Sequence, residues 1–273
     1  MFIAFDFGIS NTDIAVWDKD VIHFYSSPTP NSSLDLKLLQ QLLIKHELSI
    51  ASATLIGVTG GKSSHLPDNI NSIPIIKVNE VDAIGLGAKT LYNIDDRPTL
   101  AVSAGTGTAC ILITGDSFSH LGGIAVGGGM LEGLGSLLYK NSNGQEINEF
   151  ATQGSRDKLD LLIGDVVNKI GSLSPEITAV NFGKAKIASA DSIENTSAAL
   201  CNMVGEVIGT IAYLNALLVG SSRVCFIGRT SYLSEVTKGI DERLQLAGIS
   251  GQYNDHREYG NVIGVIEQLK NYG

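Results

Sequence analysis

Two glycine-rich segments near the middle of the chain have the residue types that bind phosphate. The first, Gly105-Thr106-Gly107-Thr108, interrupts two apolar, strand-like runs. Its glycines permit a tight turn with exposed N–H groups, and its threonines add two hydroxyls. The second, Gly127-Gly128-Gly129, precedes apolar residues at helical spacing, so it marks a helix start, where amides and the helix dipole favour anions. Either segment alone could simply make a turn, but together they favour a bound polyphosphate.

A third turn of this kind lies near the N-terminus. Asp6, Gly8, Ser10 and Asn11 fall between strand-like segments at 1–5 and 14–17. An acid, a glycine and small polar residues between two strands are typical of the first phosphate hairpin of the actin, sugar-kinase and chaperone superfamily. In that geometry the carboxylate organises Mg²⁺ and water while the turn amides meet phosphate. Such turns are common and more often only structural, so this one counts mainly in combination with the other two.

Glu80 is the candidate for proton transfer. The apolar run at 73–78 predicts a strand, and a helix is expected from about residue 83. Glu80 then lies at the carboxyl end of a strand, where open α/β sheets place their ligands. The alternative is that Asn79 or Asp82 caps the helix and Glu80 is an exposed first-turn acid. Spacing alone leaves both interpretations open.

Composition excludes several classes of function. The 273 residues are 44% hydrophobic and 17% charged, with a net charge of −9, a pI near 5.0 and no cluster of Lys and Arg, which argues against nucleic-acid binding. The apolar runs are short and interrupted, and the N-terminus has no basic leader, so we expect neither a membrane span nor a signal peptide. Three cysteines without metal-ligand spacing indicate reduced, buried thiols in a cytoplasmic protein.

The order of the predicted elements indicates an internal repeat. A strand–turn–strand unit followed by alternating strands and helices occurs at 1–91 and again at 99–230, which predicts two related α/β halves around a cleft. Helices are expected at 158–170 and 196–218. The second is apolar over more than one stripe, so it is either buried inside its domain or part of a two-fold interface.

Almost end to end, the chain resembles the type II pantothenate kinases. Each motif that carries the resemblance is unspecific alone, but the ordered set is strong. The set is Asp6-Phe7-Gly8, Glu80-Val81-Asp82-Ala83, the 105–108 turn, the 127–130 cluster, Thr178-Ala179-Val180-Asn181-Phe182-Gly183 and Ile227-Gly228. The motifs that begin at Glu80 and at Thr178 are the most telling pair.

The resemblance implies a fold, an activity and a quaternary structure. The fold is α/β, with two actin-like (ribonuclease H-like) domains around an interdomain nucleotide cleft. The N-terminal domain comprises 1–78 plus 258–273, and the C-terminal domain comprises 79–257 and carries a dimerising long helix. The activity is ATP- and Mg²⁺-dependent phosphorylation of pantothenate or a related small alcohol, the first step of coenzyme A biosynthesis. The implied assembly is a homodimer without nucleic-acid or membrane partners.

The resemblance also assigns roles to single residues. Glu80 is the implied general base, Asp6 the implied metal-organising carboxylate, and Ser103, His120 and Gly122 the implied substrate-binding residues. The implied nucleotide-binding residues all belong to the glycine-rich turns: Asp6, Gly8, Ser10, Asn11, Gly105, Thr106, Gly107, Thr108, Gly127, Gly128, Gly129 and Gly228.

Two positions depart from the family pattern, and both lose a cation. Asp13 stands where these kinases have a phosphate-contacting lysine, although an Asp occupies this place in the similar turn of the ATP-utilising hydantoinase and oxoprolinase group. His120 stands where an arginine normally binds substrate and the transferred phosphate. Lys62 is a candidate replacement cation, unless it is only a solvated surface lysine. The departures keep two alternatives open: a weakly active paralogue that binds ATP or acyl-CoA, and an ATPase with a different acceptor.

Overall fold

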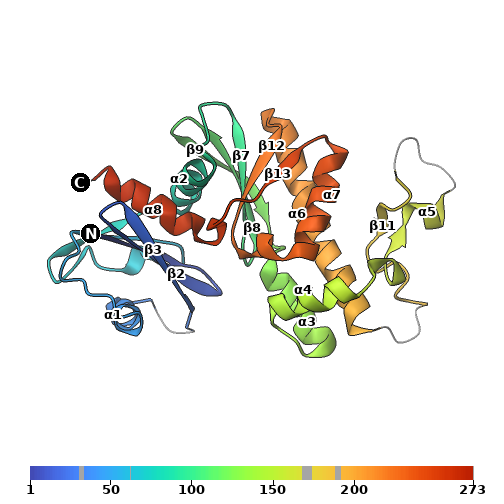
Figure 1. The fold of residues 1–273 in the computed structure, drawn as a ribbon, viewed down its shortest axis with the longest axis horizontal. Coiled ribbons are helices and arrows are strands. Elements are labelled where there is room, and N and C mark those ends of the chain that lie inside the picture. The colour runs from blue at the N-terminus through green and yellow to red at the C-terminus, as the bar shows by residue number, and fades with distance from the viewer. Residues whose placement is uncertain (31–33, 62, 168–173, 188–191, 273) are drawn as a thin grey trace.

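Two mixed β-sheets, each covered by helices on both faces, form two lobes that lie side by side (Figure 1). The computed structural model describes residues 1–30, 34–61, 63–167, 174–187 and 192–272. Both termini lie in the same lobe, because the last helix returns to the first sheet (Figure 1). The α/β fold predicted from the sequence is confirmed.

The first sheet has the strand order β3-β2-β1-β4-β6-β5. The first three strands form an antiparallel meander, and β4 and β6 extend it in parallel with β1. Strand β1 alternates its side chains between two cores, with Ile3 and Phe5 facing one helix and Ala4 facing the other. The strands are β1 (Phe2–Phe7), β2 (Asn11–Asp18), β3 (Val21–Pro28), β4 (Leu55–Thr59), β5 (Asn69–Ile70) and β6 (Ile73–Lys77).

Helices α1 (Leu36–Lys45) and α8 (Gly260–Lys270) cover the two faces of this sheet. Helix α1 begins after Asp35, whose carboxylate accepts a hydrogen bond from the backbone N–H of Leu38 and so caps the helix. Helix α8 comes from the far end of the chain and packs on β1, β2 and β4. Its apolar residues at 262, 265, 266 and 269 repeat at helical spacing against the sheet.

The second sheet repeats the topology of the first. Its order, β13-β12-β7-β8-β9, again joins an antiparallel meander to two parallel strands. Helix α2 (Glu80–Tyr92) covers one face, and α6 (Ile193–Val219) with α7 (Ser234–Leu246) covers the other. The prediction of two related halves is therefore confirmed. The strands are β7 (Thr99–Ala104), β8 (Thr108–Thr114), β9 (Ser117–Ile124), β12 (Arg223–Ile227) and β13 (Ser250–Gln252).

Helices α2 and α8 join the two lobes by crossing at a contact made of glycines. A Cβ at position 87 would lie 1.9 Å from the carbonyl oxygen of Gly260. A Cβ at position 264 would lie 1.9 Å from the carbonyl oxygen of Ala83. Because no side chain separates the helices there, their backbones touch directly.

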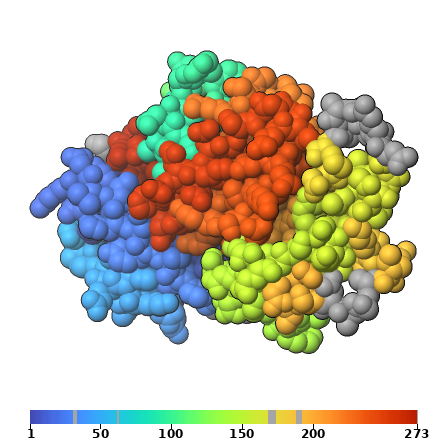
Figure 2. Space-filling view, turned by 45° about the vertical axis from the view of Figure 1, so that its right-hand side comes forward, coloured from blue at the N-terminus to red at the C-terminus, as the bar shows by residue number. Residues whose placement is uncertain are grey.

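The remaining elements extend the second lobe away from the first (Figures 1 and 2). They are the helices α3 (Gly128–Tyr139), α4 (Gly144–Gln153) and α5 (Ile163–Val166), and the short strands β10 (Leu161–Leu162) and β11 (Thr178–Val180).

The helix predicted at 158–170 is confirmed only at 163–166, where α5 lies, and is wrong at 158–162. A 3₁₀ turn at Arg156–Lys158 leads into β10, which pairs with β11 instead of continuing a helix. The buried carboxylate of Asp160 explains the break, because it accepts hydrogen bonds from the Phe182 backbone at 2.8 Å and from Asn202 at 3.0 Å. These two long-range bonds fix Asp160 outside helical geometry, and periodicity does not reveal them.

Helix α6 is long and apolar enough to cross a membrane by composition. In the fold it packs against α4, α7 and β7 and buries small and branched residues along its length. It is therefore a core helix of the second lobe. Its outer face keeps an exposed apolar stripe made of Val207, Leu214, Leu217 and Leu218.

Candidate active site

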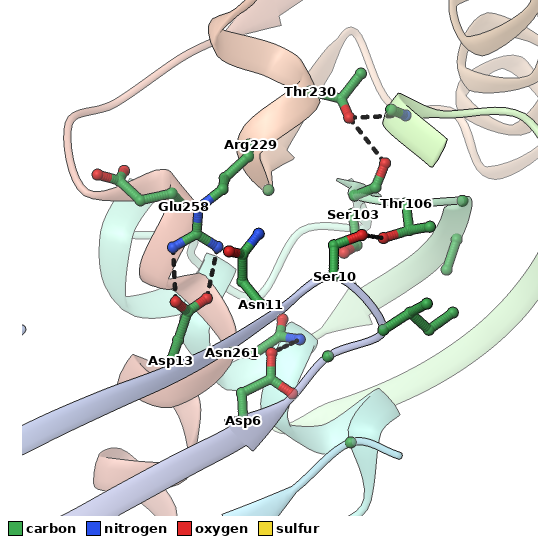
Figure 3. A pocket seen from close by; sticks show the side chains of 18 of the residues that line it. Asp6, Ser10, Asn11, Asp13, Ser103, Thr106, Arg229, Thr230, Glu258 and Asn261 are labelled. Atoms are coloured by element: carbon green, nitrogen blue, oxygen red, sulfur yellow. Dashed lines mark hydrogen bonds and ion pairs between the residues drawn. The ribbon is translucent and has the colours of Figure 1, made fainter. Parts of the chain in front are cut away.

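The two lobes enclose a cavity of about 590 Å³ at the ends of the repeated strand–turn–strand units (Figure 3). Because the sheets share one topology, the β1–β2 turn and the β7–β8 turn occupy corresponding places and face each other across it. Most of the residues predicted for the site line this cavity: Asp6, Gly8, Ser10, Asn11, Glu80, Ser103, Gly105, Thr106, Gly107, Thr108, Gly128, Gly129 and Gly228.

Hydrogen bonds from Thr29 hold the first turn in place. The hydroxyl of Thr29, just beyond β3, donates to the carbonyl of Gly8 at 2.8 Å, and its backbone N–H donates to the carbonyl of Ser10 at 2.9 Å. A Cβ on Gly8 would lie 2.7 Å from the carbonyl oxygen of Asn11, so the turn is too tight for a side chain there. The turn is therefore preformed, with Ser10 and Asn11 at its tip.

The 127–129 glycines support the second turn in a way the sequence did not predict. The backbone N–H of Gly128 donates to the carbonyl of Gly105 at 2.9 Å, and that of Gly129 donates to the carbonyl of Thr106 at 3.0 Å. These two amides are therefore already paired, so they do not present themselves to an anion. A Cβ on Gly127 would lie 2.6 Å from the carbonyl oxygen of Gly105. The glycines permit α3 to lie directly against the turn, and Gly127 does not itself line the cavity.

The two turns touch across the cleft. The hydroxyls of Ser10 and Thr106 are 2.8 Å apart and share a hydrogen bond, as Figure 3 shows. The Thr108 hydroxyl instead donates to the carbonyl of Val126 at 2.7 Å, so it holds the turn rather than facing a ligand. Of the two threonines, Thr106 is therefore the one whose hydroxyl faces the opposite lobe.

Asp6 has the most perturbed carboxyl group in the cavity. Burial raises its pKa to about 7, the neighbouring charges of Asp13 and Glu80 add to the rise, and the hydrogen bond from the Asn261 side chain at 2.9 Å opposes it. Asp13 is its direct partner in the β1–β2 ladder, which places the two carboxyl groups on one face of the sheet. The sequence reading missed Asn261, which α8 brings to the site from the end of the chain.

Glu80 satisfies both of the interpretations that its spacing left open. It is the first residue of α2, and the side chain of Asn79 caps that helix by accepting a hydrogen bond from the Val81 backbone at 2.8 Å. Glu80 is an exposed first-turn acid, and it also lines the cavity. Its charge contributes to the raised pKa of Asp6.

Arg229 is the main residue that the sequence reading missed. It follows Gly228 at the end of β12, and its guanidinium makes a two-point ion pair with Asp13, with N–O distances of 2.7 and 2.6 Å (Figure 3). The acid that departs from the family pattern thus has a cation from the opposite lobe. Lys62, the cation proposed from the sequence, lies outside the described residues. The signal available in the sequence was the Gly228-Arg229-Thr230 segment directly after a strand.

His120 and Gly122 do not line this cavity. Both lie on β9, the edge strand of the second sheet, next to a bulge that opposes Cys110 and Ile111. His120 is exposed, and strand alternation puts it on the same face as Phe118, which packs against Gly85 of α2. His120 therefore belongs to the face of the sheet that carries the helix beginning at Glu80.

The repeated sheets, the crossing helices and the two opposed turns define an actin-like fold with a nucleotide-sized cleft. Solved structures agree. The activator of the 2-hydroxyisocaproyl-CoA dehydratase from Clostridium difficile, solved with bound ADPNP, matches with a TM-score of 0.65 at 13% identity over 99% of this chain and 96% of that one. A ROK family glucokinase from Streptomyces griseus, solved with glucose and AMPPNP, matches with a TM-score of 0.58 at 13% identity over 98% and 99% of the two chains. At these identities the likeness shows the fold.

Sequence comparison gives the family. The Fumble family model matches residues 88–238, more than half of the chain, and the chain belongs to this family. A protein of Oceanobacillus iheyensis named type II pantothenate kinase is 34% identical over 178 residues, which cover 63% of this chain and 66% of the relative. Its namesake in Staphylococcus saprophyticus is 29% identical over 220 residues, 77% of this chain and 82% of the relative. The resemblance found in the motifs is confirmed.

Proposed function

We propose that this protein is an ATP-dependent kinase that phosphorylates pantothenate or a closely related small alcohol, the first step of coenzyme A biosynthesis. The observation that carries the proposal is the meeting of two phosphate-type turns and Glu80 on one cavity, in a chain of this family. The polyphosphate lies between the Ser10–Asn11 turn and the 105–108 turn. Gly228 lies towards the nucleoside end, and Ser103 is on the acceptor side.

Glu80 is the proposed general base. The acceptor's primary hydroxyl gives its proton to the Glu80 carboxylate as its oxygen attacks the γ-phosphorus, and ADP leaves with the electrons of the broken P–O bond. Most of the rate enhancement in such a reaction comes from alignment of the two substrates and from charge neutralisation. Glu80 suits the role because it is exposed at the cavity, at a rigid helix start.

Asp6 fits the proposed Mg²⁺. Burial and the charges of Asp13 and Glu80 raise its pKa although Arg229 partly opposes the rise, so a further cation beside the carboxyl group would be favourable. The buried hydroxyl of Thr59, its partner in the β1–β4 pairing, has no hydrogen-bond partner among the described residues. Within the described part of the chain, no group of three or more acidic, histidine or cysteine side chains is placed to hold a metal. Mg²⁺ would therefore take Asp6 together with phosphate oxygens and water, a common arrangement for this ion. Bound there, it would neutralise charge on the polyphosphate.

An assay of ADP release with and without pantothenate tests the proposal and separates it from its rivals. We expect ADP release that depends on pantothenate and yields the phosphorylated acceptor at a matching rate. ADP release that ignores pantothenate would support an ATPase with a different acceptor. Nucleotide binding without turnover would support a weakly active paralogue. Rescue of a strain that lacks its own pantothenate kinase is the matching test in cells.

We further propose a cytoplasmic homodimer built on α6. The support is the exposed stripe on the outer face of α6, where Val207, Leu214 and Leu218 are spaced by seven and four residues. Leu137 and Leu138 of the neighbouring α3 are also exposed, at 73% and 58%. Apolar surface of this kind is typical of a two-fold interface. Light scattering at micromolar concentration should return twice the chain mass, and replacing Leu214 and Leu218 with Glu should return the monomer mass.

The domain division proposed from the sequence, 1–78 with 258–273 and 79–257, receives support from α8, which packs on the first sheet. Limited proteolysis near residues 78 and 258 would test it.

A further inference from the structure

Acids outnumber cations around the cavity. Among the described residues that line it, the charged side chains are Asp6, Asp13, Glu80, Glu132 and Glu258, against Arg229 and Arg257. A polyphosphate that enters this space meets negative charge on several sides. Its affinity therefore depends on Mg²⁺ and on whichever of the two arginines is able to reach it.

Arg257 is buried and bonded within the protein. It is 9% exposed, its Nε donates to the Ser231 hydroxyl at 2.9 Å, and its Nη atoms donate to the carbonyls of Asn254 and Ser231 at 3.0 and 3.2 Å. Its guanidinium also lies 3.4 Å from the centre of the Tyr232 ring. This network fixes the loop around residue 257, so Arg257 is a structural anchor beside the cavity.

Arg229 is differently placed. Its side chain is 38% exposed, whereas its partner Asp13 is 6% exposed. The pair crosses from the turn after β12 in one lobe to β2 in the other, next to Ser10 and Asn11 of the first phosphate turn (Figure 3). Asp13 and the Ser26 hydroxyl, at 3.0 Å, take three of the five donors that a guanidinium carries. The backbone at this point is fixed, because a Cβ on Gly228 would lie 2.4 Å from the Ala104 carbonyl oxygen.

We propose that Arg229 is the polyphosphate-binding cation of this protein and that Asp13 is the residue that positions it. The inference rests on the proposed function and deepens it. A guanidinium held in a two-point carboxylate contact has its planar fork oriented before nucleotide arrives, and the same fork matches phosphate oxygens. Arg229 also neutralises Asp13, which explains how an acid is tolerated at the end of a phosphate turn. The cation expected on the hairpin is thus supplied from across the cleft.

The competing explanation is a purely structural one, in which the ion pair only holds the lobes together. The two roles differ in which half of the pair matters. A structural bridge is broken whichever partner is removed, and the extra cost of leaving the buried Asp13 unpaired in Arg229→Ala disappears in the double variant. A phosphate ligand needs the guanidinium, and Asp13 serves it only by orientation. A comparison of single and double replacements therefore separates them.

The experiment measures two quantities for each variant: the affinity for Mg²⁺·AMPPNP by calorimetry, and kcat and KM for ATP at saturating pantothenate. The variants are Arg229→Ala, Asp13→Asn, the double variant D13N/R229A and the charge-preserving Arg229→Lys. Arg97→Ala is the matched control, since Arg97 is an exposed arginine paired with Asp95 away from the cavity. Melting temperatures report on folding, and D13N/R229Q replaces the ion pair with amides of similar shape if the alanine variants fail to fold.

We expect Arg229→Ala to lower kcat/KM for ATP by about 10²-fold or more, because it removes a cation and leaves Asp13 unpaired beside the phosphates. Asp13→Asn should lose less than about 10-fold. The double variant should regain part of the AMPPNP affinity, because the repulsion is gone, while kcat remains at least about 10-fold low. Arg229→Lys should fall between Arg229→Ala and the parent.

Two results would overturn the proposal. The first is wild-type AMPPNP affinity and kcat in D13N/R229A or D13N/R229Q. The second is that Asp13→Asn and Arg229→Ala lose kcat/KM equally and the double variant loses no more than either. If the parent protein shows no turnover with pantothenate, the proposed acceptor is wrong, but the AMPPNP affinities still decide the role of Arg229.

Discussion

Replacing Asp6 with Asn should make the free protein more stable at pH 8 and also inactive. Asn has nearly the shape of a protonated Asp and keeps an oxygen that can accept from Asn261. The Asp6 pKa rises from 3.8 to about 7 on folding, so below about pH 4 the group is neutral in both states. Between about pH 4 and 7 the native state retains a proton that the unfolded chain has released, and each pH unit then costs up to about 1.4 kcal/mol of stability.

Over the whole window the loss is at most on the order of 4 kcal/mol, and Asn at position 6 escapes it. The assay is urea unfolding of parent and variant at pH 4.5 and pH 8, without nucleotide or Mg²⁺. The variant's advantage should be small at pH 4.5 and reach its full size by pH 8. If the variant's gain in free energy of unfolding is equal at both pH values, or if the variant is less stable than the parent at pH 8, then ionised Asp6 does not destabilise the folded protein. In the same variant, Mg²⁺·ATP should no longer raise the melting temperature as it does in the parent.

Three further predictions follow from the site and the lobe contact. Glu80→Gln should leave AMPPNP affinity nearly intact while kcat falls by roughly 10²-fold or more, and near-normal turnover would remove Glu80 from the mechanism. If His120 contacts the acceptor, His120→Ala should raise the KM for pantothenate and His120→Arg should preserve or lower it; unchanged values in both variants across pH 6 to 9 would make it a surface residue of β9. Gly264→Ala should lower the free energy of unfolding by roughly 1–3 kcal/mol because its methyl group would overlap the Ala83 carbonyl, whereas Gly133→Ala, where nothing lies within 4 Å of the added carbon, should not destabilise.

The sequence predicted the turns better than their contacts. The turn residues Asp6, Gly8 and Gly105 were recognised because tight turns between strands restrict residue type locally. The repeat of strand–turn–strand units then brought these turns to one cleft, and this followed from the order of the elements. The α/β fold was predictable for the same reason, because alternation of strands and helices leaves few topologies.

The pairing of distant charges was not predictable. Arg229 meets Asp13, and Asn261 meets Asp6, from elements more than two hundred residues away along the chain. Nothing in local propensity or periodicity specifies which cation faces which acid across a cleft. Similarly, Gly128 and Gly129 looked like free anion-binding amides, but tertiary packing against the second turn uses both. The first part of the helix predicted at 158–170 is replaced by a turn and a strand around Asp160, whose buried bonds are also long-range.

The backbone contact between α2 and α8 joins the two lobes of the molecule. At Gly87 and Gly264 the helices meet backbone to backbone, so a side chain at either position would push the two lobes apart. Glu80 begins α2 and Asn261 is the second residue of α8, so this contact sets the spacing between the proposed base and the hydrogen-bond partner of Asp6. A side chain inserted there would therefore also alter the distance between Ser10 and Thr106, the two turn residues that touch across the cleft.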